Sequence, residues 1–213
     1  MFYAKRLKRS FDLLAAVLGL ILLAPVLAAA ALAVWISLGS PVLFRQQRPG
    51  LEGRLFTILK FRTMRDQGAM SAAVLSDARR VTRVGRLLRS TSIDELPELW
   101  NVIKGEMSIV GPRPLLPQYL PRYSPRQARR HEVRPGITGW AQVNGRNAAS
   151  WQQKFELDVW YVDNISLMVD ATILWRTVIP VVLRRGINHP TAESVPEFMG
   201  DPLSASPPRV EGQ

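Results

Sequence analysis

The 213-residue chain contains no cysteine and only two histidines. The lack of cysteine excludes disulfides, cysteine-ligated zinc and a thiol nucleophile. His131 and His189 are far apart in the sequence, which argues against a histidine-rich metal site. Acidic residues are also scarce, because 17 Asp and Glu stand against 28 Lys and Arg and give a net charge of +11. Such a chain attracts polyanions: nucleic acid, anionic lipid or phosphorylated small molecules.

Almost all of the basic residues are arginines. Arginine rather than lysine favours bidentate recognition of phosphate groups. The length suffices for one domain with a hydrophobic core, or for a small domain together with a membrane element.

Residues 13–36 lack charge altogether, and only Gly19 and Pro25 interrupt this apolar run. The run is long enough to cross a bilayer, which takes ~20 residues. Three interpretations are open. The run is a signal peptide cleaved near the small residues 28–30, a single transmembrane helix that tolerates Pro25, or a re-entrant hairpin that enters and leaves on one face.

The position of Pro25 and the charges around the run suit the re-entrant hairpin. Pro25 divides the run into residues 13–24 and 26–36, and at ~1.5 Å per residue each part spans about half of the hydrocarbon core. Basic residues favour the cytoplasmic side of a membrane. They lie on both sides of the run: Lys5, Arg6, Lys8 and Arg9 before it, and Arg45, Arg48 and Arg54 after it.

The remaining sequence predicts an α+β fold that is mainly helical. Two β-rich stretches, residues 42–47 and 54–63, flank turn-forming residues and predict a short β-hairpin. Residues 165–183 are too polar for a membrane span, and we expect an interfacial amphipathic helix there. Further helices are predicted at residues 82–88, 95–104, 124–133 and 151–161. A loop is expected at 67–77, largely extended chain at 110–117 with its three prolines, irregular chain at 134–146, and a mobile or loosely docked tail from 188 onwards.

Two adjacent carboxylates, Asp94 and Glu95, precede the helix predicted at 95–104. Ser92 and Glu95 fit a capping box, although Pro97 then lies beyond the first turn. If Asp94 is the cap instead, Pro97 is tolerated and the helix dipole favours the ionised form of Asp94. An ionised carboxylate at a helix start can be a nucleophile or a metal ligand, but spacing alone favours the capping role.

Three arginines, Arg89, Arg113 and Arg146, each lie beside a turn or helix-breaking residue. Each one alone is expected to be a solvated surface residue. Together with the glycine-rich stretch 136–145 they could bind a diphosphate, and a carboxylate near such a site would bring Mg²⁺.

Three more acidic residues, Glu156, Asp158 and Asp163, lie on the helix predicted at 151–161 or just after it. They could form a second metal site, but a solvated helix face is the favoured interpretation. The tryptophans of this region are expected in the core or at a membrane interface rather than in a base-stacking surface.

Several motifs resemble the bacterial sugar transferases, also called monotopic phosphoglycosyl transferases. The resemblance covers residues 5–186, and the tail AESVPEFMG (192–200) is similar to that of small members with only the catalytic domain. The motifs are KRSFD (8–12), KFRTM (60–64), SIDELPELWNVIKGEMSIVGPRPL (92–115), RPGITGWAQVNGRN (134–147) and FELDVWYVDNIS (155–166).

The resemblance implies transfer of a phosphosugar from a UDP-sugar to polyprenol phosphate, usually undecaprenyl phosphate, with release of UMP. The product would start a lipid-linked glycan for exopolysaccharide, capsule, O-antigen or glycoprotein. The family implies a re-entrant helix in the bacterial inner membrane, contacts with its lipids and an active site on the cytoplasmic face. We therefore expect a membrane-embedded segment at 1–40, a catalytic domain at 41–187 and a tail at 188–213, with a homodimer left open.

The resemblance also implies roles for single residues. Asp94 matches the family nucleophile, which forms an aspartyl-phosphosugar intermediate, and Glu95 completes the dyad, where Mg²⁺ is expected. Arg89, Arg113 and Arg146 match positions that hold phosphates or the nucleotide. Two further features complete the comparison: the turn with Pro112 and Pro114 matches a segment near the active site, and the family's Ser-Pro helix break is replaced by Ala24-Pro25.

Two rival interpretations remain. A membrane-anchored nucleic-acid-binding protein would explain the net charge and the tryptophans, but not the Asp-Glu dyad or the GPRP turn. An inactive relative would keep the fold, but the dyad and the arginines are intact. We therefore expect an enzyme that does not bind nucleic acid.

Overall fold

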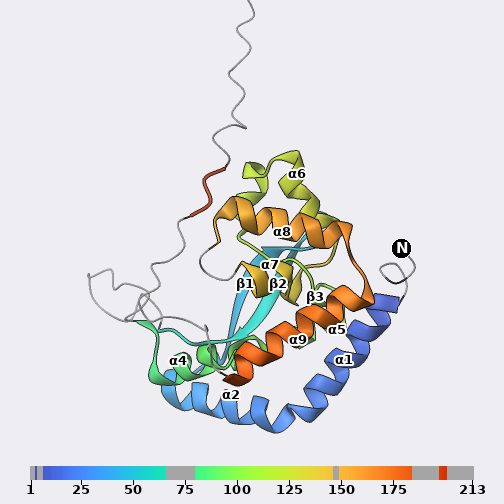
Figure 1. Cartoon of the computed structure of the whole chain (residues 1–213). Coiled ribbons are helices and arrows are strands. Elements are labelled where there is room, and N and C mark those ends of the chain that lie inside the picture. Colours follow the sequence, from blue (N-terminus) through green and yellow to red (C-terminus); the bar gives the residue numbers. More distant parts are fainter. Residues whose placement is uncertain (1–2, 4–6, 66–79, 146–148, 184–196, 201–213) are drawn as a thin grey trace, which may run out of the picture.

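The computed structural model describes residue 3 and residues 7–65, 80–145, 149–183 and 197–200. The predicted α+β fold, mainly helical, is confirmed: helices surround two small two-stranded sheets. Helices α1 (Lys8–Leu22) and α2 (Ala24–Leu38) form one edge of the molecule, and α6 (Pro125–Ala128) and α8 (Trp151–Asp163) lie at the opposite end (Figure 1).

The apolar segment forms two helices that bend by 64° where α1 meets α2. Within the described residues no single helix is both long and apolar enough to cross a membrane, whereas this bent pair passes the same test together. The break falls at Leu23, slightly before the predicted Ala24-Pro25. Pro25 lies in the first turn of α2, where its missing N–H group breaks no hydrogen bond.

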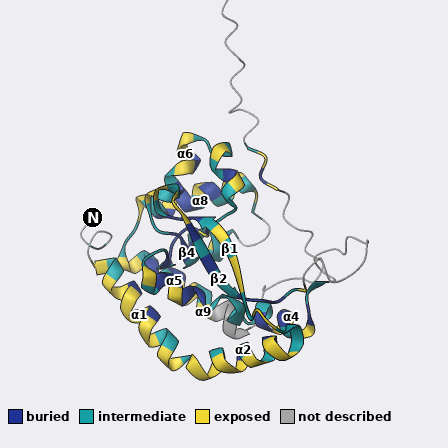
Figure 2. Ribbon diagram, turned by 180° about the vertical axis from the view of Figure 1, so that it is seen from behind, coloured by how far each residue is buried: buried dark blue, intermediate teal, exposed yellow. Residues whose placement is uncertain are grey.

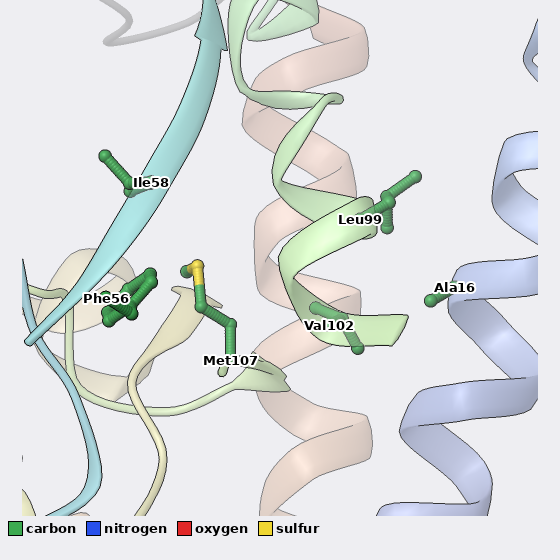
Figure 3. Packing of buried hydrophobic residues seen from close by; sticks show 6 residues of the cluster. All are labelled: Ala16, Phe56, Ile58, Leu99, Val102 and Met107. Carbon is green, nitrogen blue, oxygen red and sulfur yellow. The ribbon is translucent and has the colours of Figure 1, made fainter. Parts of the chain in front are cut away.

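The predicted hairpin is confirmed as strands β1 (Leu43–Pro49) and β2 (Leu55–Phe61), which pair antiparallel around a short 3-10 turn. Alternate residues of β2 point into the core. Phe56 and Ile58 pack against Met107 and against α5 (Glu98–Lys104), and Ala16 of α1 covers the far side of α5 (Figure 3).

A second sheet was not predicted. Strand β3 (Ser108–Val110) pairs parallel with β4 (Gly136–Thr138), and α7 (Trp140–Asn144) follows, so the prediction of irregular chain at 134–146 is wrong. These strands are too short to show an alternating pattern. Glycine allows their close approach, because a Cβ atom on Gly136 would overlap the backbone nitrogen of Gly111.

The other predicted helices are present with shifted ends. Helix α4 (Arg83–Ser90) is capped by Thr82, and Gly105 ends α5 in the left-handed conformation. The helix predicted at 124–133 is a short α6 followed by the 3-10 turn Arg129–Glu132. Helix α8 starts at a Ser150–Gln153 capping box, and α9 spans Leu167–Leu183.

The first turns of α1 bind the rest of the molecule through polar contacts. Arg9 donates to the carbonyls of Val102 and Ile103 at the end of α5. Lys8 forms an ion pair of 2.6 Å with the buried Asp170 of α9. Asp12, also buried, accepts hydrogen bonds from the Ser108 hydroxyl and the Ile109 N–H group. The KRSFD motif thus fixes α1 against α5, α9 and β3.

The outer faces of α1, α2 and α9 expose large apolar side chains (Figure 2). Leu22 is 74% exposed, Ile36 is 72% exposed and Met168 is 76% exposed. Many large exposed apolar side chains on the same helices are typical of an interaction site for protein or membrane.

Asp12→Ala should lower the free energy of unfolding by ~1–3 kcal/mol, because it leaves the half-buried Ile109 N–H group without an acceptor. Asp12→Asn retains a carbonyl acceptor and should cost less. Thermal unfolding of both variants in detergent checks this, and an alanine variant as stable as the wild type would contradict it.

Candidate active site

A cavity of about 450 Å³ opens between the end of β2, helix α4 and the loop after β3. We call it the dyad pocket because Asp94 and Glu95 line it. Basic residues outnumber these two carboxylates, so the pocket suits an anion. The lining residues are Phe44, Lys60, Phe61, Arg62, Thr63, Met64, Arg80, Arg89, Ser92, Asp94, Glu95 and Arg113.

The dyad lies in the 3-10 turn Ile93–Glu95 and not at the start of a helix. Ser92 has a φ of 56° and caps nothing, so the predicted capping box is wrong, as is the alternative in which Asp94 is the cap. Helix α5 begins only at Glu98, because Pro97 has no N–H group and its ring obstructs a continuous helix. The left-handed conformation at Ser92 costs of the order of 1–3 kcal/mol and turns the chain so that the dyad reaches the pocket.

Glu95 is held by two cations. Its Oε1 atom lies 2.6 Å from Lys60 Nζ and 2.5 Å from Arg113 Nη2. Burial alone would raise the pKa of Glu95, but the charges of Arg113 and Lys60 and their hydrogen bonds lower it to about 2. Glu95 is therefore ionised, its charge is balanced by the two cations, and it holds both of them in place.

Asp94 has no hydrogen-bond or ion-pair partner among the described residues. Burial and then the charge of Glu95 raise the pKa of Asp94, against the opposing effect of Lys60, Arg89 and Arg113. The prediction that a helix dipole favours the ionised form is thus wrong, because Asp94 is not at a helix start. Asp94 is a carboxylate that faces the pocket with both oxygens free.

Lys60 and Glu98 also belong to the site, although the sequence did not predict them there. Lys60 Nζ lies 3.0 Å from Glu98 Oε1 as well as close to Glu95, so the lysine bridges two carboxylates. Burial raises the pKa of Glu98 to about 7; Lys60 opposes the rise and the charge of Glu95 adds to it. The alternation of β2 and the three-residue spacing of Glu95 and Glu98 are the signals that could have found them.

Two of the three predicted arginines line the pocket. Arg89 Nε donates to the Thr63 hydroxyl at 2.9 Å, which fixes it beside Asp94. Pro112 and Pro114 are buried on either side of the exposed Arg113, so the predicted turn holds this arginine toward the dyad. Arg146 lies outside the described residues.

The second metal site considered for α8 is not formed by the described residues. The favoured alternative, a solvated face, is wrong for Asp158, which is buried against Arg130. The interpretation as a solvated face is correct for Asp163 and Glu156, which are exposed.

Glu98→Gln should become more stable relative to wild type as the pH rises from about 4.5 to about 7. A raised carboxyl pKa contributes stability below the unfolded value that is lost as the pH rises through the folded value, and glutamine does not ionise. Melting temperatures of both proteins between pH 4 and 8 measure the difference. Glu156→Gln, on the exposed face of α8, is the control, and a difference for Glu98→Gln that is independent of pH would refute the expectation.

The model of the family described as bacterial sugar transferase matches residues 3–184. The chain is 56% identical over 190 residues to EpsL of Bacillus subtilis (strain 168), described as an uncharacterized sugar transferase, covering 88% of this chain and 94% of that protein. It is 46% identical over 181 residues to a UDP-glucose:undecaprenyl-phosphate glucose-1-phosphate transferase of Caulobacter vibrioides, covering 80% and 68%. It is 40% identical over 180 residues to a UDP-N-acetylgalactosamine-undecaprenyl-phosphate N-acetylgalactosaminephosphotransferase of Aeromonas hydrophila, covering 81% and 43%. The chain belongs to the bacterial sugar transferase family.

Proposed function

We propose that this protein transfers a phosphosugar from a UDP-sugar to undecaprenyl phosphate, releases UMP and so starts a lipid-linked glycan such as an exopolysaccharide. One observation carries the proposal: Asp94 is half-buried in the dyad pocket, has no hydrogen-bond or ion-pair partner among the described residues, and lies beside the cations that Glu95 holds. The names of the Caulobacter and Aeromonas relatives supply the substrate classes.

The free carboxylate of Asp94 suits nucleophilic attack on the β-phosphorus of the UDP-sugar. A bond forms between an Asp94 oxygen and phosphorus, and the bond from phosphorus to the bridging oxygen breaks, so UMP leaves with the electron pair. A phosphate oxygen of undecaprenyl phosphate then attacks the same phosphorus and releases Asp94. Splitting one displacement into two lets each substrate react in turn.

The cations of the pocket suit the charge that develops in both steps. Phosphoryl transfer depends mainly on positioning and on electrostatic stabilisation of phosphate oxygens. Arg89 and Arg113 lie beside Asp94 and would hold the diphosphate, with Arg146 proposed for the nucleotide. Glu95 would act indirectly, by fixing Arg113 and Lys60.

The dyad fits a Mg²⁺ ion that is shared with the substrate. Among the described residues, neither oxygen of Asp94 has a partner, and Glu95 Oε2 has only a long contact of 3.5 Å from Arg113 Nη1. One or two carboxylates together with substrate phosphates and water are the usual ligands of Mg²⁺. When bound, the ion would neutralise charge on the diphosphate.

The bent pair α1–α2 would lie in one leaflet of the bacterial inner membrane, with the dyad pocket on the cytoplasmic face. Three observations support this: the 64° bend, the apolar outer faces of α1, α2 and α9, and the basic residues on both flanks. Basic side chains near anionic lipid contribute ~1 kcal/mol each to membrane binding.

Incubation of the detergent-solubilised protein with Mg²⁺ and a panel of UDP-sugars, without acceptor, should release UMP and add a phosphosugar mass to the peptide that contains Asp94. Glucose and N-acetylgalactosamine donors come first, because the relatives' names specify them. Asp94→Asn should remain folded and show neither product. A folded Asp94→Asn variant with normal turnover would refute the assignment of the nucleophile.

Removal of divalent cations with EDTA should abolish release of UMP, and added Mg²⁺ should restore it. Calcium should restore it poorly, because Ca²⁺ prefers longer bonds and more ligands than this pocket supplies. Full activity in EDTA would contradict the proposed metal.

A further inference from the structure

A buried ion pair outside the lining of the dyad pocket joins the 3-10 turn Arg129–Glu132 to helix α8. Arg130 and Asp158 are each only 3% exposed. Arg130 Nε and Nη2 donate to Asp158 Oδ2 at 3.0 and 2.7 Å. The proposed reaction uses neither residue.

Arg130 also binds the backbone of a pocket residue. Its Nη2 atom donates to the carbonyl oxygen of Arg113 at 2.7 Å. The neighbouring Pro112 carbonyl accepts from the Gly136 N–H group at 3.0 Å, so the backbone here is fixed from two sides. The Arg113 side chain then extends to Glu95. Arg130 therefore contacts the dyad indirectly, through Arg113.

Aromatic rings exclude water from the pair. The Arg130 guanidinium lies over the rings of Tyr123 and Phe155, at 5.9 and 5.7 Å from their centroids. Phe198, from the described part of the tail, packs on both rings, with centroids 5.8 and 4.9 Å away. The fork of an arginine inside this shell can adopt few other positions, so it defines where the Arg113 carbonyl lies.

Stability alone does not account for such a pair. Burying two charges costs several kcal/mol each, and well-packed apolar residues of similar volume often give equal or higher stability. What apolar residues cannot supply is a donor for the Arg113 carbonyl.

We infer that Arg130, held by Asp158, is a positioning residue that sets the place of Arg113 in the dyad pocket. The inference rests on the proposed role of Arg113 in binding the diphosphate. It assigns to the FELDVWYVDNIS motif a function at a distance from the substrate.

The test is the double variant Arg130→Met/Asp158→Leu. Its melting temperature should stay close to that of wild type, because removal of two buried charges offsets the loss of the hydrogen bond to the Arg113 carbonyl. By contrast, kcat/KM for the UDP-sugar should fall about 10- to 100-fold, because small displacements of a binding group carry such costs. Arg129→Gln is the matched control: Arg129 joins the same two elements through an exposed ion pair with Asp163 and does not touch Arg113. It should keep wild-type kinetics.

A double-mutant cycle with Arg113→Ala separates positioning from a merely structural role. If Arg130 acts through Arg113, adding Arg130→Met/Asp158→Leu to Arg113→Ala should cause no further loss of kcat/KM. The inference would be overturned if the fold-decreases in kcat/KM of the two variants multiply when they are combined. It would also be overturned by a folded Arg130→Met/Asp158→Leu protein with wild-type kcat/KM. An Arg113→Ala variant with full activity would instead overturn the proposed role of Arg113, and this inference with it.

Arg130→Lys covers the case in which the Met/Leu variant does not fold. Lysine keeps the charge beside Asp158 but lacks the planar fork that reaches both partners. A folded Arg130→Lys protein should show a lowered kcat/KM, and unchanged kinetics would count against the inference.

Discussion

The carboxylate of Glu95 joins three parts of the chain that are far apart in the sequence. Lys60 comes from the end of β2, Glu95 from a 3-10 turn and Arg113 from the loop after β3. Because these segments belong to different elements, the charge of Glu95 is what joins them at the pocket. Removing one cation would leave a partly buried carboxylate without full compensation, which is usually more costly than never having had the pair.

The two carboxylates of the dyad have different surroundings because of the turn that holds them. A 3-10 turn has about three residues per turn, so consecutive side chains point roughly 120° apart. Both carboxylates line the pocket, but Glu95 is bound by Lys60 and Arg113 whereas Asp94 has no such partner among the described residues. Adjacent residues of the same chemical type thereby acquire opposite pKa shifts, with Glu95 lowered and Asp94 raised. This difference supports distinct roles for them, with Asp94 reacting and Glu95 organising the cations.

The sequence predicted the elements that have strong local signals. The hairpin is marked by its β-rich stretches and turn residues, and the end of α5 by Gly105. The dyad with Arg89 and Arg113 was predicted as one site, and the structure places all four residues at one pocket. The β3–β4 pair was missed because three-residue strands leave no pattern, and the buried state of Asp158 was missed because its partner Arg130 lies in another element. The left-handed Ser92 has no local signal either, since glycine or asparagine usually occupies that conformation.

The close approach of β3 and β4 restricts which residues the chain can accept. Added Cβ atoms on Gly111, Gly136 and Gly139 would all overlap backbone atoms, and the one on Gly139 would overlap the Gln142 side chain as well. A clash with a side chain can be relieved by a smaller neighbour, but every residue has the same backbone atoms. No second substitution can therefore compensate for a larger residue at these positions. The two motifs that supply β3 and β4 lie well apart in the sequence, yet each must keep its own glycines for the two strands to approach.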